Sequence, residues 1–159
     1  MHKLITCLQE KNLTIATVES LTGGLLCAKL SAVPGASKVL KGGFVTYMSE
    51  VKEQVLGIEH NLLATYGVVS KECAKAMAIQ GANHIHADIV LACTGNAGPD
   101  VLEGKAVGLV DMAIFFCGKV YVFEEIFPGD RDAVRQAVCD YLVEKVLALL
   151  GNTKNTGNI

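Results

Sequence analysis

The sequence of 159 residues has no run of basic side chains, no CxxC pair and no long uninterrupted apolar stretch. Its 14 lysine and arginine residues nearly balance 16 aspartate and glutamate residues, so no basic surface for a row of phosphates is expected. The longest apolar runs, such as Val107–Cys117, are interrupted and fall well short of the ~20 residues that a spanning helix needs. We therefore expect neither a nucleic-acid-binding nor a membrane protein.

The cysteines form no compact cluster of metal ligands, and their spread is typical of buried thiols in a reducing compartment. They are Cys7, Cys27, Cys73, Cys93, Cys117 and Cys139. The first 13 residues are charged and lack a long apolar core, which does not fit a signal peptide. His84 and His86 are expected to be a surface pair at a helix end. These features predict a cytoplasmic protein without a metal or cofactor.

Helical and strand patterns alternate along the chain. Hydrophobic residues make up 51% of the sequence, which is enough to form one hydrophobic core. Helices are predicted around 4–8 and over Gly24–Ser31, Ser49–Leu56, Lys71–His84 and Asp130–Leu150, with a turn at Leu62–Tyr66. Strands are predicted at Thr14–Glu19, Lys41–Tyr47, Asp88–Thr94, Ala106–Phe116 and Lys119–Phe127. Cys117-Gly118 marks a hairpin between the last two.

This order of elements predicts an α/β fold, a three-layer α/β/α sandwich with a mixed, mostly parallel sheet of five to six strands. Residues 1–150 are predicted to form one domain. Residues 151–159 are polar and rich in asparagine and glycine, and are predicted to form a flexible tail.

Residues 19–24 (ESLTGG) follow the first strand, where ligands bind in open α/β sheets. Two glycines in a first helical turn each cost roughly 0.5–1 kcal/mol relative to alanine. One interpretation is that an oxyanion or phosphate approaches the backbone N–H groups here. The other is that Thr22 caps the helix and the glycines serve packing.

A lysine stands at an unusual place in the next strand-to-helix junction. If Ser49 caps this helix, the position of Lys52 should favour Glu or Gln. A cation in the first turn opposes the helix dipole, which favours the neutral amine that a general base requires. The alternative is an exposed lysine paired with Glu50 or Glu53.

Two further segments are candidates for binding. Residues 94–99 (TGNAGP) follow a buried strand and form either the floor of a pocket or an ordinary turn. The spacing of Gly98 and Gly104 does not match a phosphate-binding P-loop. Arg131 and Arg135 share a helix face and could hold an anion. The alternative there is that Asp130 caps the helix and Asp132 pairs with an arginine.

Six segments together carry a family resemblance. From Leu4 to Leu150 the chain resembles the CinA C-terminal domain family, because it carries six segments in the order found in that family. They are TVESLTGG, VPGAS, GGFVTY, YGVVS, TGNAGP and FPGDRDAVR. The resemblance implies a nicotinamide-nucleotide amidohydrolase that converts nicotinamide mononucleotide to nicotinate mononucleotide and ammonia in pyridine-nucleotide salvage. It also implies a mixed α/β/α sheet and a homo-oligomer, a dimer or larger.

The resemblance implies roles for individual residues. Ser20 corresponds to the nucleophile, and Lys52 and Tyr47 to the groups that activate it, with the proton passing to Lys52 directly or through Tyr47. The turn of Thr22, Gly23 and Gly24 is expected to bind the oxyanion or substrate. From position and charge, Thr94, Gly95 and Arg131 are expected to hold the ribose and phosphate.

The chain departs from the family pattern at three places. Leu21 stands where cysteine is usual and Asn96 where isoleucine is common. The stretch from Asp100 to Gly108 is shorter and lacks a glycine pair and a proline, and its part up to Lys105 is expected to border the pocket. Two alternatives therefore stay open, a non-catalytic nucleotide- or partner-binding domain and a serine amidase or esterase for another small substrate.

Overall fold

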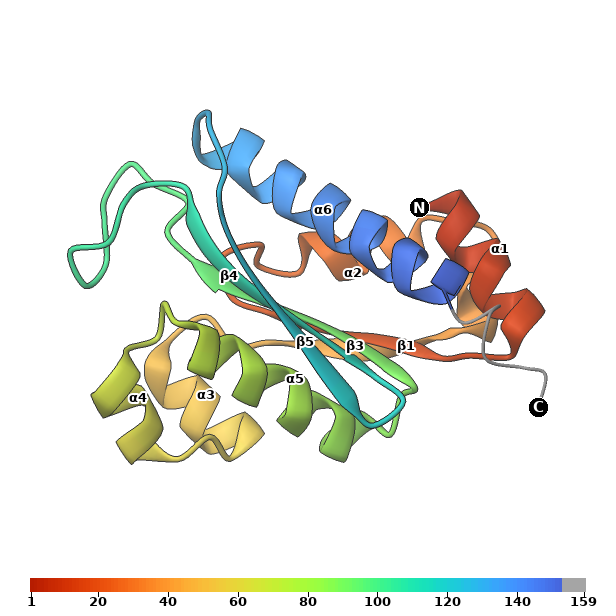
Figure 1. Cartoon of the computed structure of the whole chain (residues 1–159), viewed down its shortest axis with the longest axis horizontal. Helices are drawn as coiled ribbons and strands as arrows, with labels where there is room; N and C mark the ends of the chain where they lie inside the picture. The colour runs from red at the N-terminus through yellow and green to blue at the C-terminus, as the bar shows by residue number, and fades with distance from the viewer. Residues whose placement is uncertain (153–159) are drawn as a thin grey trace.

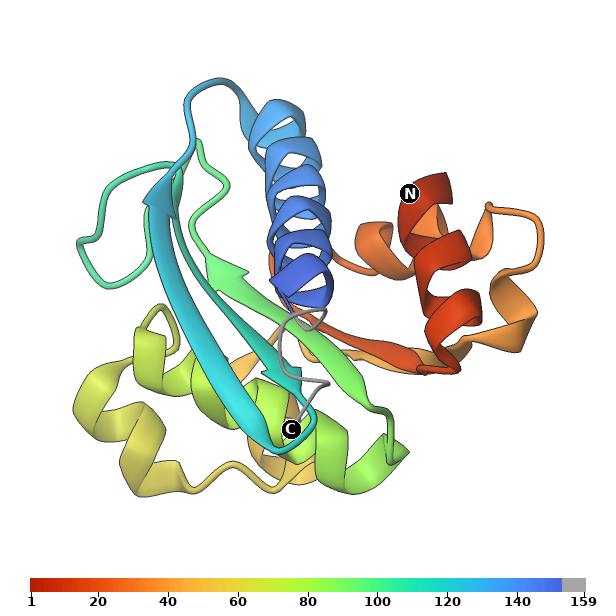
Figure 2. The ribbon, with the colours of Figure 1, turned by 45° about the vertical axis from the view of Figure 1, so that its right-hand side comes forward.

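The computed structural model describes residues 1–152 as a five-stranded sheet with helices on both faces (Figures 1 and 2). The strands are β1 (Ile15–Glu19), β2 (Leu40–Val45), β3 (Ile89–Gly95), β4 (Leu109–Phe116) and β5 (Lys119–Ile126). The helices are α1 (His2–Lys11), α2 (Leu25–Ser31), α3 (Ser49–Leu56), α4 (His60–Tyr66), α5 (Lys71–Ile85) and α6 (Arg131–Asn152), with a 3₁₀ turn η1 at Ala36–Lys38.

The strand order is β2-β1-β3-β4-β5. Strand β1 pairs in parallel with β2 and β3, whereas β4 is antiparallel to both β3 and β5. Helices α1, α2 and α6 cover one face of the sheet and α3, α4 and α5 the other (Figure 1). The predicted three-layer α/β/α sandwich with a mixed sheet is confirmed, with five strands and only β4 reversed.

The central strands are buried on both faces, and successive side chains feed two different cores. Ile15, Ile89 and Leu91 belong to the apolar cluster under α1, α2 and α6. Their neighbours Val18 and Val90 belong to the cluster against α5. The near-continuous apolar run of β3 follows from this double burial.

The predicted hairpin at Cys117-Gly118 is confirmed. Phe116 pairs with Lys119 across a two-residue turn, and both turn residues have positive φ, 46° at Cys117 and 85° at Gly118. This is the combination that a type I′ turn requires. Cys117 is exposed at the turn, contrary to the expectation of buried thiols, and Cys7 and Cys27 are half-buried.

The structure differs from the predicted elements at several places, among them the start of β4, which is Leu109 and not Ala106, and the end of β2, which is Val45 and not Tyr47. The segment expected to be a turn at Leu62–Tyr66 is the helix α4, which is too short to display a helical period but buries Leu63 in the core beneath α5. Helix α6 continues through residues 151 and 152, where a flexible tail was predicted. The rest of that tail, residues 153–159, lies outside the described residues. No helix within 1–152 is long and apolar enough to cross a membrane.

Helix α5 lies close to the sheet because Gly81 faces it. A Cβ atom at Gly81 would stand 2.4 Å from Val18 Cγ2 and 3.0 Å from Val90 Cγ1. Both valines are fully buried and have no room to move away. The glycine therefore sets the distance between α5 and the two central strands.

We predict that Gly81→Ala destabilises the protein by about 1 kcal/mol, because overpacking costs ~1–3 kcal/mol and exceeds the ~1 kcal/mol gain in helix propensity. Urea unfolding measures the difference. Gly151→Ala is the matched control, since nothing lies within 4 Å of a Cβ there. Equal stability changes in the two variants would contradict this packing.

Candidate active site

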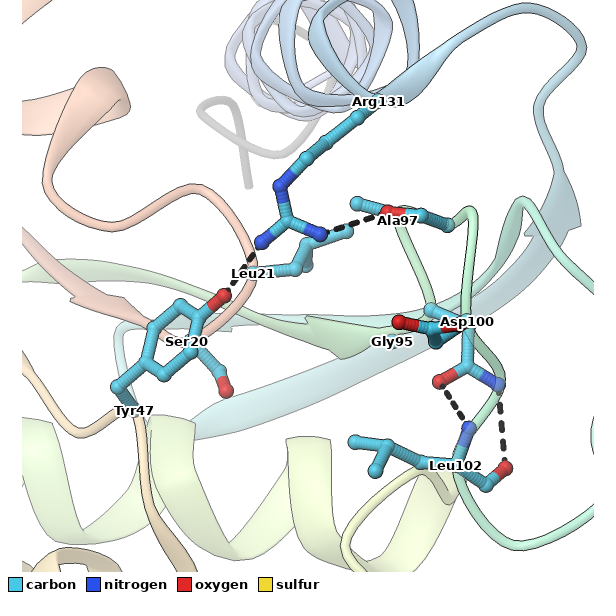
Figure 3. A pocket seen from close by; sticks show the side chains of 10 residues that line it. Ser20, Leu21, Tyr47, Gly95, Ala97, Asp100, Leu102 and Arg131 are labelled. Carbon is cyan, nitrogen blue, oxygen red and sulfur yellow. Dashed lines mark hydrogen bonds between the residues drawn. The ribbon is translucent and has the colours of Figure 1, made fainter.

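A pocket of about 240 Å³ lies at the carboxyl ends of β1 and β3 (Figure 3). Parallel strands bring these ends to one edge of the sheet, where ligands bind in α/β folds. The lining residues come from all four segments that the sequence singled out, and they are Ser20, Leu21, Tyr47, Gly95, Asn96, Ala97, Gly98, Asp100, Leu102 and Arg131. Of the segment 94–99 that was expected to form a pocket floor or a turn, residues 95–98 line this pocket and Thr94 and Pro99 do not.

Lys52 lies directly behind Ser20. Its amine is 3.1 Å from Ser20 Oγ, 2.6 Å from the carbonyl oxygen of Thr46 and 3.4 Å from that of Tyr47. The Lys52 residue is only 1% exposed, and burial lowers the pKa of its amine. The alternative of an exposed lysine paired with an acidic neighbour is therefore wrong, and Glu53 contacts His60 instead.

These three contacts fit an ammonium that donates to all three oxygens, Ser20 Oγ included, and they also fit a neutral amine that accepts a hydrogen bond from the Ser20 hydroxyl. A neutral lysine has two N–H groups and one lone pair. Its two N–H groups donate to the two carbonyl oxygens, which leaves the lone pair to accept the Ser20 hydroxyl proton. In the charged form, the same two carbonyl oxygens accept hydrogen bonds from the ammonium. The site can thus change protonation state without rearrangement.

Glu19 anchors the turn that presents Ser20, a role that the sequence interpretation missed. Its fully buried carboxylate accepts hydrogen bonds from the backbone N–H groups of Gly24 (3.0 Å), Leu26 (2.9 Å) and Cys27 (2.8 Å). It satisfies N–H groups at the start of α2, whose N-cap Gly24 has no side chain to do so. An acidic residue ending an otherwise apolar strand was the signal for this role.

The ESLTGG turn differs from both predicted interpretations. The Gly23 N–H donates to the Ser20 carbonyl oxygen and the Gly24 N–H to Glu19, so neither N–H is free to hold an oxyanion. Both glycines have positive φ, which the turn itself requires. Thr22 does not cap α2, because its buried hydroxyl lies 3.2 Å from Cys93 Sγ. Ser49 likewise is not a cap, since α3 begins at Ser49 after Met48.

Two expected ribose or phosphate contacts also have structural roles. The Thr94 hydroxyl is buried and donates to the Val68 carbonyl oxygen at 2.6 Å, away from the pocket. Gly95 lines the pocket, but a Cβ there would stand 2.5 Å from the Leu109 carbonyl oxygen. Glycine is thus required by the neighbouring strand β4.

Arg131 reaches from α6 across the pocket (Figure 3). It donates to the Tyr47 hydroxyl at 2.6 Å and to the Gly98 carbonyl oxygen at 2.7 Å. The Tyr47 hydroxyl is therefore bound to Arg131, while Lys52 contacts Ser20 directly. A proton relay through Tyr47 is not needed.

The two arginines of α6 do not share an anion site. Arg135 points elsewhere and donates to the Thr22 carbonyl oxygen at 2.9 Å. Asp130 accepts a hydrogen bond from the Ala133 N–H at 2.9 Å, and Asp132 lies 3.5 Å from Arg135. The interpretation with a capping and a pairing aspartate is the one confirmed.

The loop after β3 borders the pocket, as expected, and Asn96 holds it in shape. The buried Asn96 amide donates to the carbonyl oxygens of Leu102 (3.2 Å) and Lys105 (3.1 Å) and accepts from the Leu102 N–H (3.1 Å). On the outer side, Glu103 accepts from the N–H groups of Val68 (2.8 Å) and Val69 (3.2 Å). The sequence interpretation missed these roles.

No group of three or more His, Cys, Asp or Glu side chains within residues 1–152 is arranged to hold a metal ion. The pair of histidines predicted to lie at a helix end does so. His84 belongs to the last turn of α5, and His86 follows as its C-cap. Both residues are exposed, and His84 Nε2 lies 3.2 Å from the Leu56 carbonyl oxygen.

A sequence model of the CinA C-terminal domain matches residues 1–150. The chain belongs to the CinA C-terminal domain family. A competence-damage inducible protein of Geobacillus is 46% identical over 140 residues, which cover 87% of this chain but only 34% of that relative. The chain thus spans about a third of its length. The MG115 homolog of Mycoplasma pneumoniae is 40% identical, with 87% of this chain and 88% of that protein covered.

Solved CinA superfamily structures have the same fold. A protein from Klebsiella pneumoniae superposes with a TM-score of 0.91 at 30% identity, covering 95% of this chain and 98% of that one. A competence/damage inducible protein from Agrobacterium tumefaciens gives 0.88 at 35% identity, covering 92% and 91%. This chain therefore has the fold of its family.

We predict that Glu19→Gln destabilises the CinA domain by about 2–3 kcal/mol. The amide keeps one acceptor oxygen and turns an NH₂ group toward backbone N–H donors, so charge-assisted hydrogen bonds worth ~1.5–3 kcal/mol are lost. Chemical unfolding measures the effect. Glu10→Gln in α1 is the control for losing one carboxylate, and an equal effect there would refute the anchoring role.

The lowered pKa of Lys52 predicts a pH dependence of stability. Between that lowered pKa and the ordinary value of 10.5, the unfolded chain binds a proton that the folded protein does not, so stability rises with pH. Lys52→Met removes this pH-dependent contribution to the free energy of unfolding. The wild type should therefore gain stability relative to Lys52→Met as the pH rises through this window. Urea unfolding at several pH values tests it. Lys75→Met, at an exposed position of α5, is the control for replacing a lysine by methionine.

Proposed function

We propose that this CinA domain is an amidohydrolase that converts nicotinamide mononucleotide to nicotinate mononucleotide and ammonia. The observation that carries the proposal is the buried Lys52 amine, 3.1 Å from the hydroxyl of Ser20 at the wall of a pocket. A serine becomes a nucleophile when an adjacent base accepts its proton. A lysine serves as that base when burial keeps its amine neutral.

In the first half-reaction, the Ser20 hydroxyl gives its proton to Lys52 as Oγ bonds to the carboxamide carbon. The carbonyl π electrons move onto oxygen, which gives a tetrahedral oxyanion. When the oxyanion collapses, the C–N bond breaks, and the Lys52 ammonium returns the proton to the departing nitrogen. Ammonia leaves, and a nicotinoyl ester remains on Ser20.

In the second half-reaction, water attacks the ester carbon while Lys52 takes one of its protons. Collapse of the second oxyanion breaks the bond to Ser20 Oγ, which recovers its proton from Lys52. The products are the nicotinate carboxyl group and the original enzyme. The carbonyl oxygens of Thr46 and Tyr47 stabilise the ammonium in both halves.

The oxyanion needs a donor other than Gly23 or Gly24, whose N–H groups are already bound. We assign this role to the N–H of Leu21. It follows the nucleophile in sequence, its residue lines the pocket, and it donates to no acceptor within residues 1–152. The residue after the nucleophile supplies such a donor in other serine hydrolases. One donor of this kind is worth ~3 kcal/mol in the transition state.

Arg131 is proposed to bind the phosphate. Its guanidinium lines the pocket and donates to two neutral acceptors, the Tyr47 hydroxyl and the Gly98 carbonyl oxygen. A phosphate offers stronger, charge-assisted hydrogen bonds than either. Tyr47 would then orient the guanidinium.

The test is ammonia release from nicotinamide mononucleotide by the purified wild type and its variants. Ser20→Ala is expected to lower kcat by about 10⁴-fold or more, since nothing replaces the nucleophile. Lys52→Met should lower it by about 10²–10⁴-fold, the range for a general base. Ser49→Ala is the matched control, because this exposed serine begins α3 without facing the pocket.

Different outcomes separate this proposal from its alternatives. Binding of the mononucleotide without ammonia release would indicate a binding domain. Release from an uncharged amide at the same rate, unaffected by Arg131→Ala, would indicate an amidase with another substrate. Activity that persists in Ser20→Ala would rule out the serine mechanism.

A further inference from the structure

Two charged side chains line the pocket, and they come from different walls. Arg131 extends from α6, and Asp100 belongs to the loop after β3 (Figure 3). Arg131 donates only to neutral acceptors. Asp100 makes no hydrogen bond or ion pair with any residue in the described range 1–152. The pocket thus offers one positive and one negative group, each without a partner of opposite charge.

The position of Asp100 is fixed by the loop around it. Asn96 binds Leu102 through both its amide nitrogen and its amide oxygen, just beyond Asp100 in the chain. Glu103 binds two backbone N–H groups of the segment before α5, and Lys105 donates to the Val69 carbonyl oxygen. This loop is held at its base and its far side, so it presents Asp100 in a defined place.

Binding of nicotinamide mononucleotide calls for both charges. Its ring nitrogen is bonded to the ribose, which makes the ring a pyridinium cation, and the phosphate at the other end is an anion. The reacting carboxamide is attached directly to the cationic ring. Asp100 lines the same pocket as Ser20, so a ring whose carboxamide reaches Ser20 can have this carboxylate as its counter-ion while Arg131 serves the phosphate.

We propose that Asp100 is the counter-ion of the substrate's cationic ring. The inference rests on the proposed function and deepens it, because it assigns the side chain that distinguishes a cationic from a neutral ring in the substrate. Asp100 contributes to binding and selection, not to proton transfer. A neutral ring of the same shape gains nothing from it.

The test compares nicotinamide mononucleotide with its reduced form, which has the same carboxamide, ribose and phosphate but an uncharged dihydropyridine ring. Binding of each is measured by calorimetry to the Ser20→Ala protein, which holds the ligand without turnover, with and without Asp100→Asn. Asp100→Asn should raise the Kd of the oxidised form about fivefold, the upper range for a charge pair open to solvent. The Kd of the reduced form should stay the same.

Asp132→Asn is the matched control, because this exposed carboxylate lies on α6 outside the pocket lining. It should change neither Kd. Equal weakening of both ligands by Asp100→Asn, or weakening of neither, would overturn the role of Asp100.

Ammonia release by the wild type separates this failure from a failure of the proposed function. If the wild type releases ammonia and Asp100→Asn still binds both ligands normally, only the counter-ion role is wrong. If the mononucleotide neither binds nor is hydrolysed, the proposed function is wrong and the counter-ion role fails with it.

Discussion

The rest of the site depends on the burial of one lysine. An ammonium taken out of water without compensation costs several kcal/mol, so a buried lysine persists by losing its proton or by finding partners. Lys52 has both routes, since burial lowers the pKa of its amine and two carbonyl oxygens lie within 3.4 Å. Burial thus favours the neutral amine, while the two carbonyl oxygens can also accept hydrogen bonds from the ammonium.

The sheet brings this lysine to a serine 32 residues earlier in the chain. Strands β1 and β2 are parallel neighbours, and the ladder continues beyond β2 through the Thr46 N–H, which donates to the Glu19 carbonyl oxygen at 2.9 Å. Helix α3 begins three residues later, so Lys52 in its first turn reaches back to the end of β1. On the other side, the Ser20 N–H donates to the Cys93 carbonyl oxygen of β3 at 3.1 Å.

Glu19 links the two halves of this arrangement. Its carbonyl oxygen holds the segment that carries Thr46, and its carboxylate holds the start of α2. A displacement of either of these two segments would therefore move Ser20 relative to Lys52. The buried charge is compensated by three N–H groups at the start of a helix, an environment that favours an anion.

The sequence predicted the elements whose patterns are local. The apolar run of β3 and the turn chemistry of Cys117-Gly118 each reflect neighbouring residues, and both elements are found. The contact between Ser20 and Lys52 depends on parallel pairing of distant strands, so only the family resemblance indicated it. The predicted roles of Gly23 and Thr94 were wrong, because the type of a residue does not determine which acceptor its N–H or hydroxyl group bonds to. Short helix α4 was missed because seven residues are too few to show a period.

Asn96 and the loop that follows it form one connected feature. Asn96 makes three hydrogen bonds to Leu102 and Lys105, which an apolar side chain at this position could not make. The shorter loop lacks the glycine pair and the proline, yet it still reaches the pocket with Asp100 and Leu102. A buried amide is costly unless its groups are paired, and here both its nitrogen and its oxygen are bound. Asn96 therefore ties this loop to the end of β3, and residues of both line the pocket.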